Sequence, residues 1–360
     1  MRTKHAVVYI LTGIIISSCI RPEAPNAQAD ILTCKVPGVT MTTNPIISNN
    51  SVTIFVAPGT DVSDLTPEFT LTPGATISPS SGTERNFQSP QDYTVTAQDG
   101  YWKKAYTVSV IDTELATNYN FEDTLGGQKY YIFVEREAGK VVMEWASGNA
   151  GYAMTGVPNT ANEYPTFQVA GGTTGKCLSL ITRSTGFFGS LVGMPIAAGN
   201  LFIGSFDTNS ALSNPLKATK FGLPFLHVPT YLAGYYKYKA GSQFTEGGNP
   251  VSGKKDICDI YAIMYETSES VHTLDGTNAF TSPNLVSIAR INDAKETDEW
   301  TYFKLPFATL PGKFIDKDKL KAGKYNISIV FTSSLEGDHF NGAIGSTLLI
   351  DEAELIYRSE

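Results

Sequence analysis

The stretch KAGKYNISIVFTSS, residues 321–334, decides the fold class of the larger part of the chain. Its side chains alternate with the period of two that is typical of a β-strand. The runs EWTYFKLPF (299–307) and STLLIDEAELIY (346–357) have similar character, and no stretch of 15 residues has a convincing helical period. Residues 114–360 are therefore predicted to form antiparallel β-structure, as a jelly roll or a related two-sheet sandwich. In residues 321–334, one face would carry Tyr325, Ile327, Ile329 and Phe331, and the other Asn326, Ser328 and Thr332.

A second β-domain precedes this one. In YTVTAQDGYWKKAYTVSVID (93–112), two alternating runs flank the turn residues Asp99 and Gly100, which predicts a hairpin. The run SVTIFVA (51–57) alternates in the same way. Short strands with regular turns over about eighty residues indicate a small sandwich, which we place at residues 35–113. The whole chain is thus expected to be all-β.

The 93–112 hairpin resembles the last hairpin of Ig-like modules found on bacterial surfaces, in which YTVTA and DG are followed by K and YTV. This resemblance implies an Ig-like β-sandwich and identifies no ligand. We expect the module to act as a spacer.

The beginning of the chain has the layout of an export signal. A basic head with Arg2 and Lys4 precedes an apolar run, two serines and Cys19. The apolar run is too short for a spanning helix. Ile16–Cys19 also resembles a bacterial lipobox, which implies a signal peptide at residues 1–18 and lipidation of Cys19. An ordinary signal peptide with a chance cysteine is the alternative.

Residues 19–34 are polar and contain Pro22 and Pro25, so we interpret them as a tether. Glu23 and Asp30 make this segment acidic, which loosely resembles the acidic stretch of surface lipoproteins in glycan-consuming gut bacteria. The resemblance implies an outer-membrane lipoprotein exposed at the cell surface, with the membrane lipid as its anchor.

Charge and cysteine content exclude some classes of function. The formal net charge of -8 argues against a nucleic-acid partner. Besides Cys19, the chain has Cys34, Cys177 and Cys258, with no CxxC spacing that would indicate zinc. Cys177 and Cys258 lie in apolar, strand-like runs, so we predict free, buried thiols. A Cys177–Cys258 disulfide is the alternative.

Four stretches of the larger domain carry a further resemblance. They are GNLFIGSF (199–206), FGLPF (221–225), PTYLAGYYKYKAG (229–241) and SSLEGDHFNGAIGSTLLIDEAELIY (333–357). Together they resemble the "putative carbohydrate metabolism" domain family of gut-bacterial exported proteins. The resemblance implies a jelly roll similar to carbohydrate-binding modules and a role in carbohydrate metabolism. Some members of this family carry a glycoside hydrolase label.

Sugar binding requires aromatic faces for stacking on pyranose rings, together with polar side chains for the hydroxyl groups. The segment EWASGNAGYAMTGVPN (144–159) combines Trp145, Asn149 and Tyr152 with small residues. Tyr236 and Tyr238 share one face of a predicted strand, while Tyr235 and Lys237 share the other. For each group the alternative is packing in the core. Trp300 and Tyr302 form a weaker pair of the same kind.

Acidic residues suggest two further hypotheses. Carbohydrate-binding sandwiches with similar ends often hold a structural calcium, and oxygen ligands from Glu122 and Asp351 would suit that cation. No other cofactor is required. Hydrolysis would need a pair of carboxyl groups in one pocket, and nothing in the sequence pairs any two of them. The candidates are Glu144, Asp207, Asp256, Asp259, Glu266, Asp338 and Asp351.

The sequence therefore predicts a lipid-anchored surface protein that captures polysaccharide or oligosaccharide without cleaving it. Other surface proteins of glycan utilisation would be its partners. A glycoside hydrolase and a structural or adhesive surface protein are the alternatives.

Overall fold

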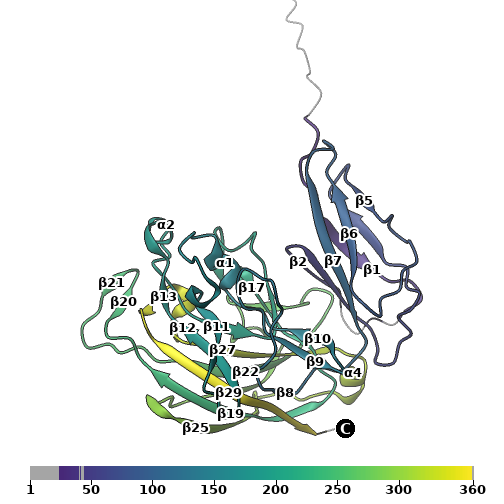
Figure 1. Cartoon of the computed structure of the whole chain (residues 1–360). Coiled ribbons are helices and arrows are strands. Elements are labelled where there is room, and N and C mark those ends of the chain that lie inside the picture. The colour runs from purple at the N-terminus through teal and green to yellow at the C-terminus, as the bar shows by residue number, and fades with distance from the viewer. Residues whose placement is uncertain (1–23, 40, 42–43, 359–360) are drawn as a thin grey trace, which may run out of the picture.

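The structure, a computed structural model, describes residues 24–39, 41 and 44–358 of the chain. The chain forms two β-domains that lie side by side, the smaller one coloured purple to blue in Figure 1. In this described part, no helix has the length and hydrophobicity that crossing a membrane requires. The predicted signal peptide and Cys19 lie outside the described residues.

The N-terminal domain packs a five-stranded sheet against a two-stranded one. The five-stranded sheet has the order β2-β3-β7-β6-β5, and β3 runs parallel to β7. Alternate residues of these strands point into one core, where Val52, Tyr93 and Val108 are almost fully buried. The strands are β1 (Ile31–Lys35), β2 (Ile46–Ser48), β3 (Ser51–Phe55), β4 (Glu68–Leu71), β5 (Thr76–Ser78), β6 (Gln91–Thr96) and β7 (Lys103–Ile111).

The predicted hairpin is confirmed. Strands β6 and β7 pair antiparallel, with Tyr93 opposite Tyr106, and Gly100 adopts a φ of 75° in the turn between them. A left-handed conformation of this kind favours glycine, so the Asp-Gly pair sets the turn.

The predicted tether is too long at its C-terminal end. Strand β1 begins at Ile31 and pairs with β4, and Ile31 and Cys34 belong to the domain core. The backbone N–H of Asn26 also donates a hydrogen bond to Gln98 at 2.9 Å. The sequence does not show this strand clearly, because the apolar Leu32 next to Ile31 is 51% exposed and breaks the alternation of apolar and polar residues.

The C-terminal domain is the predicted two-sheet sandwich. Its first large sheet has the order β11-β12-β29-β19-β25, with β8 on β29, and its second has the order β15-β27-β22-β24-β26, with β18 on β27. We call these the β19 sheet and the β22 sheet. The β19 sheet contains β8 (Asn118–Tyr119), β11 (Thr166–Ala170), β12 (Lys176–Ile181), β19 (Val228–Lys239), β25 (Thr297–Pro306) and β29 (Thr347–Arg358). The β22 sheet contains β15 (Asn200–Phe202), β18 (Leu223–Pro224), β22 (Asp259–Glu266), β24 (Leu285–Arg290), β26 (Ala308–Thr309) and β27 (Tyr325–Thr332).

The main core fills the space between these two sheets. On β27, Ile327, Ile329 and Phe331 point into it as predicted. The alternate residues Asn326 and Ser328 are buried as well. The outer face of the β22 sheet is therefore covered by other parts of the chain, whereas a half-buried strand would expose it.

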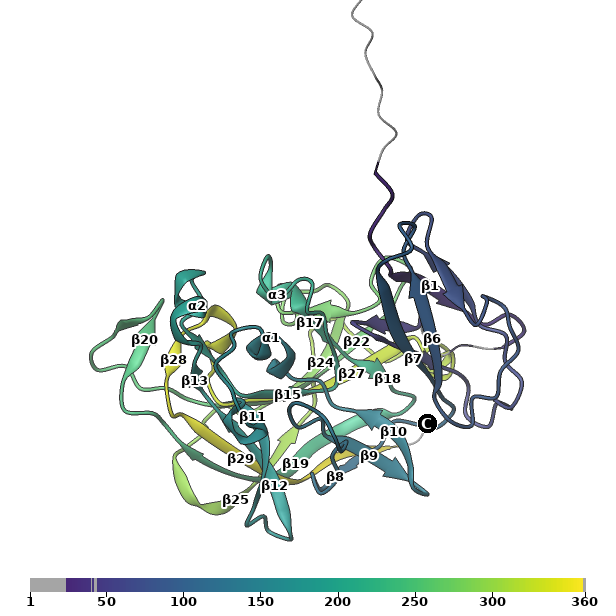
Figure 2. The ribbon, with the colours of Figure 1, turned by 45° about the horizontal axis from the view of Figure 1, so that its top comes forward.

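Short elements cover the outer face of the β22 sheet. The helices α1, α2 and α3 all lie on the same side of the domain (Figure 2). The longest described helix has six residues, in agreement with the lack of helical periodicity. The helices are α1 (Asn149–Ala153), η1 (Ala161–Glu163), α2 (Gly186–Leu191), α3 (Pro215–Ala218), α4 (Lys317–Lys321) and η2 (Gly337–His339). The small strands are β9 (Val134–Glu137), β10 (Lys140–Glu144), β13 (Arg183–Ser184), β14 (Ile196–Ala197), β16 (Gly204–Phe206), β17 (Thr219–Phe221), β20 (Phe244–Glu246), β21 (Asn249–Pro250), β23 (Leu274–Asp275) and β28 (Gly342–Ala343).

The two domains are in direct contact. Phe55 of the N-terminal domain packs into the core of the C-terminal domain. The carbonyl oxygen of Phe206 accepts hydrogen bonds from Ser48 Oγ at 3.1 Å and from Asn49 Nδ2 at 3.2 Å. The small domain thus supports the β16 strand of the large one.

Cys177 and Cys258 are free and buried, as predicted, and Cys34 is free and buried as well. Burial raises the pKa of the Cys34 and Cys177 thiols to about 12. These thiols are therefore protonated at neutral pH and behave as small apolar side chains.

Candidate functional site

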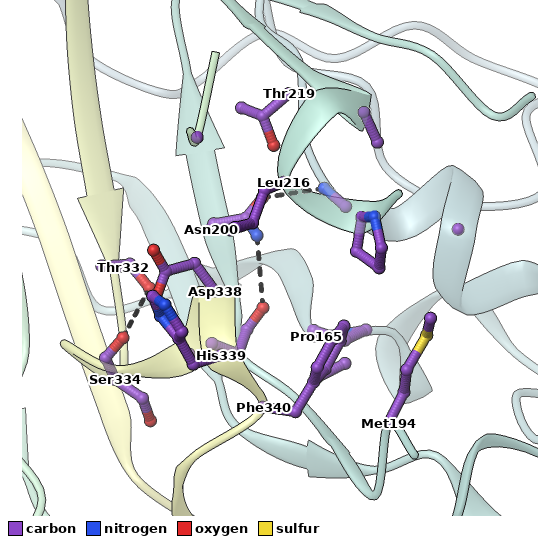
Figure 3. A pocket seen from close by; sticks show the side chains of 18 of the residues that line it. Pro165, Met194, Asn200, Leu216, Thr219, Thr332, Ser334, Asp338, His339 and Phe340 are labelled. Carbon is purple, nitrogen blue, oxygen red and sulfur yellow. Dashed lines mark hydrogen bonds and ion pairs between the residues drawn. The ribbon is translucent and has the colours of Figure 1, made fainter. Parts of the chain in front are cut away.

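A cavity of about 510 Å³ lies on the outer face of the β22 sheet. Phe202, Tyr261, Arg290 and Val330 from the sheet form its floor, and α1, α2, α3 and η2 contribute its walls. Its size falls in the range of small-molecule sites, which are commonly concave, mostly apolar and supplied with a few polar groups. Figure 3 shows Thr332, Asp338 and His339 on one side of the cavity and Pro165 and Met194 on the other.

An ion pair between the partly exposed Arg290 and the buried Asp259 crosses the floor. Arg290 Nη2 donates to Asp259 Oδ2 at 2.6 Å, and Arg290 Nε donates to Asp259 Oδ1 at 3.1 Å. The guanidinium carbon also lies 4.4 Å from the ring centre of Phe280. Burial raises the pKa of Asp259, and the bonds from Arg290 oppose this shift. The ion pair fixes Arg290 within the aromatic floor.

The polar wall of the cavity is the short helix η2 with its flanks. His339 Nδ1 lies 2.7 Å from Asp338 Oδ1, and both side chains are half or more exposed. Phe340 follows with a φ of 58°, a left-handed conformation that ends the helix. Two exposed polar side chains are therefore available at the cavity to a ligand.

The apolar wall comes from α1, from α2 and from the residues that follow them. Met154, Phe188, Val192 and Met194 line it. Phe188 and Val192 are 42% and 43% exposed although both are apolar. The carbonyl oxygen of Met194 accepts a hydrogen bond from Thr185 Oγ1 at 2.5 Å. This bond joins the two ends of the segment that contains α2.

A third wall is formed by Phe206 on β16. The carbonyl oxygen of this residue is the acceptor for Ser48 and Asn49 described above. Asn49 Oδ1 in turn accepts from the backbone N–H of Thr208 at 3.2 Å. The N-terminal domain therefore supports one wall of the cavity through these hydrogen bonds.

Comparison with protein families gives a match for each domain. The family model described as "Putative carbohydrate metabolism domain" matches residues 120–356, more than half of the chain. The chain belongs to this family. A second model, described as "SGBP, N-terminal", matches residues 31–110. Together the two matches associate the chain with carbohydrate metabolism and with glycan-related surface proteins.

Two solved structures support membership of the carbohydrate metabolism family. One, from Bacteroides thetaiotaomicron VPI-5482, is 84% identical with a TM-score of 0.89, and the match covers 94% of this chain and 100% of that one. The other, from Bacteroides vulgatus ATCC 8482, is 50% identical with a TM-score of 0.64, and the match covers 68% of this chain and 99% of that one. Both are described as a "putative glycoside hydrolase". The comparison with curated proteins finds no match.

The first predicted sugar-binding group consists of Trp145, Asn149 and Tyr152, and the structure contradicts the roles predicted for Trp145 and Asn149. Trp145 is 3% exposed and packs edge-on against Tyr119 in the main core. Asn149 is fully buried, and its amide group bonds to the backbone of Thr166 in both directions. Neither side chain can reach a sugar, because aromatic neighbours enclose Trp145 and the backbone of Thr166 holds Asn149. The sequence does not show these partners, which lie far away in the chain or form only on folding.

Tyr152, the third member of that group, does line the cavity. Its ring is 4% exposed, and its hydroxyl group donates to the carbonyl oxygen of Ser184 at 2.8 Å. Tyr152 therefore supports the wall of the cavity and presents little surface to a ligand.

The second predicted group has the opposite orientation from the one expected. Tyr236 and Tyr238 point into the main core and are 5% and 2% exposed. The alternate residue Tyr235 points outward and lies 5.3 Å from Tyr302, measured between ring centres. Tyr302 is 53% exposed, so the accessible aromatic pair of the β19 sheet is Tyr235 with Tyr302.

The predicted calcium ligands hold a loop in place. Glu122 Oε1 accepts from the backbone N–H of Lys176 at 2.7 Å, and Asp351 Oδ2 accepts from the N–H and the hydroxyl group of Thr173 at 2.6 Å. Among the described residues, no three His, Cys, Asp or Glu side chains gather as metal ligands. The two carboxylates act as caps for residues 171–176, and calcium binding by Glu122 and Asp351 stays a prediction.

Most candidate carboxyl groups for hydrolysis have structural partners away from the cavity. Asp256 Oδ2 accepts from Ser334 Oγ, Ser346 Oγ and the Ala343 N–H at 2.6–2.8 Å. Glu266 pairs with Lys319 at 2.6 Å. Of the seven candidates, the cavity contains Asp259 and Asp338.

Sequence reasoning did not find the cavity. Asp259 and Asp338 were among the candidate carboxyl groups, but Arg290 and the apolar segment GFFGSLVGM (186–194) were not considered. That segment exposes Phe187 at 85% and Leu191 at 70%. An apolar run between turn-forming glycines is the signal that could have indicated a ligand-contacting surface.

Proposed function

We propose that this protein captures an oligosaccharide, or the end of a polysaccharide, in the cavity on the β22 sheet. The observation that carries the proposal is the meeting of an aromatic floor and exposed polar side chains in one concave site. Tyr261 and Phe280 lie in that floor with ring centres 4.9 Å apart, beside Arg290. Membership of the carbohydrate metabolism family supports this class of ligand.

The polar groups suit hydroxyl-rich ligands. Arg290 has donors beyond the two bonds to Asp259, and Asp338 and His339 offer acceptors and a donor at the polar wall. Aromatic floors favour the apolar C–H faces of sugars. A neutral sugar fits best, because Asp259 already balances the charge of Arg290.

Glycoside hydrolysis is the second candidate. It is favoured by the two related structures described as glycoside hydrolases and by the presence of Asp259 and Asp338 in one cavity. Both oxygens of Asp259 accept bonds from Arg290, however, so neither oxygen is free to protonate or attack a glycosidic bond. We therefore favour capture without cleavage.

A glycan array and a hydrolysis assay on the same preparation test both candidates. We expect binding to at least one glycan without release of reducing sugar. Asp338→Asn should weaken binding, while Tyr302→Ala on the opposite sheet is the matched surface control. Turnover that Asp338→Asn abolishes would establish the hydrolase, and failure of the folded protein to bind any glycan would favour a structural or adhesive protein.

We also propose that Cys19 is lipidated and holds the protein at the outer face of the outer membrane. The export-signal layout of the sequence and the surface-protein association of the N-terminal domain support this location. Other glycan-utilisation proteins on that surface would be its partners. Cys19→Ala should release the protein from the membrane fraction or stall its processing while leaving the fold unchanged. A variant that remains membrane-bound and normally processed contradicts the proposal.

A further inference from the structure

The two sides of the cavity differ in chemistry. Thr332, Asp338 and His339 lie on one side, and Pro165 and Met194 lie on the other (Figure 3). Met154, Phe188 and Val192 extend the apolar side. A ligand that fills the cavity must therefore meet polar groups at one end and apolar groups at the other.

The few polar side chains near the apolar side are already engaged. Thr155 Oγ1 donates to the carbonyl oxygen of Tyr152 at 2.7 Å, and Thr185 Oγ1 donates to that of Met194 at 2.5 Å. The Tyr152 hydroxyl group donates to Ser184. A second sugar ring placed there would lose water from its hydroxyl groups without gaining donors in exchange, which is unfavourable.

The apolar side also leaves hydrophobic surface accessible. Met154, Phe188 and Val192 are each between 42% and 43% exposed. Leu212, another residue of the cavity lining, is 45% exposed. Exposed apolar groups gathered around a concave site mark a surface that a ligand covers. Methionine side chains are adaptable and make favourable contacts with aromatic rings.

We infer that the ligand is a sugar carrying a neutral apolar substituent, an aryl or acyl group. The sugar would bind at Asp338 and His339, and its substituent would pack against Met154, Phe188, Val192 and Met194. The inference rests on the proposed glycan-binding function and specifies its ligand class. A charged substituent is disfavoured because none of the apolar-side residues carries a charge.

Matched glycoside pairs test the inference. The probes are the methyl and 4-nitrophenyl glycosides of a panel of hexoses and pentoses in both anomeric forms, with dissociation constants from calorimetry. For the sugar that the protein recognises, we expect the 4-nitrophenyl member to bind about ten-fold more tightly, since it buries apolar surface that the methyl member leaves exposed.

Two variants of nearly conserved shape separate the ends of the cavity. Val192→Thr combined with Met194→Gln should reduce the ten-fold advantage to about two-fold and leave the methyl glycoside within about two-fold of the original affinity. His339→Gln should instead weaken both members of the pair by a similar factor. Circular dichroism and thermal unfolding confirm that each variant is folded.

The outcomes separate this inference from the proposed function. Equal affinity for both members of each bound pair, or an advantage that the apolar-side variant does not change, overturns the inference alone. Binding of no glycoside by the folded protein overturns the inference, and failure on the glycan array as well overturns the proposed function. Binding of 4-nitrophenol as tightly as its glycosides shows that the sugar contributes nothing and also overturns both.

Discussion

The two outer faces of the C-terminal sandwich use the same strand alternation in different ways. On the β22 sheet, Tyr261 and Arg290 point outward into a cavity that helices and loops enclose. On the β19 sheet, Tyr235 and Tyr302 lie outside the main core with their ring centres 5.3 Å apart. Strands β19 and β25 lie on the side of the molecule away from the start of the described chain (Figure 1). Aromatic content alone therefore does not identify a site, because the covering elements decide whether a face becomes concave.

Because the face of the β22 sheet is enclosed, a substitution there should have the largest predicted effect on the stability of the protein. Arg290→Met leaves Asp259 buried with its charge unpaired, and we expect this to lower the free energy of unfolding by about 2–4 kcal/mol. Asp259→Leu combined with Arg290→Met should recover much of that loss, because no unpaired charge remains. Chemical denaturation measures both. A loss below about 0.5 kcal/mol for Arg290→Met would mean that this face is as open as the other.

Ligand binding should separate the two faces next. Asp338→Ala combined with His339→Ala removes exposed polar groups at the cavity, and we expect sugar affinity to fall about ten-fold, the value of one or two hydrogen bonds. The matched control is Tyr302→Ala, which removes a ring that is 53% exposed on the β19 sheet and should change affinity less than two-fold. Calorimetry with the same glycan measures both. The reverse result would move the binding site to the Tyr235–Tyr302 pair.

The sequence predicted the sandwich because strand alternation is a local property. The pairs on β19 show its limit: alternation separates Tyr235 from Tyr236, but only the partner strands decide which of them faces the core. Tyr236 faces Phe303 in the interior, and Tyr235 faces Tyr302 outside. The cavity depends on contacts far apart in the chain, such as Asp259 with Arg290, and no local pattern encodes such contacts.

The stability of the C-terminal domain should respond to pH through Glu135, a partly buried residue of β9 that contacts Trp145 of the main core. Trp145 Nε1 donates to Glu135 Oε1 at 2.9 Å, and burial raises the pKa of Glu135 to about 7. Since an unfolded glutamate titrates near pH 4.3, the native state holds more protons between about pH 4.5 and 7, and stability falls as the pH rises through that window.

Glu135→Gln keeps the acceptor for Trp145 and removes the titration. We expect the variant to be about 1–2 kcal/mol more stable than the original protein at pH 8 and nearly equal to it at pH 4. Thermal unfolding across this range measures the difference, and binding at the cavity should stay unchanged. A constant difference at all pH values would show that Glu135 titrates normally and that the interior is open to water.

The smallest predicted effect concerns the loop at residues 171–176, which contacts the β19 sheet through Trp300. Trp300 Nε1 donates to the carbonyl oxygen of Gly171 at 3.3 Å, and Gly175 has a φ of 59° with Glu122 Oε1 only 2.0 Å from where a Cβ atom would lie. Gly175→Ala should therefore lower the free energy of unfolding by about 1–2 kcal/mol.

Gly139→Ala is the matched control, at a φ of 83° with open space around it. It should lower the free energy of unfolding by about 1 kcal/mol or less, because it adds conformational strain without a clash. If Gly175→Ala alone also weakened sugar binding, the β19 face and the cavity would be coupled, and the two faces could not be treated as independent.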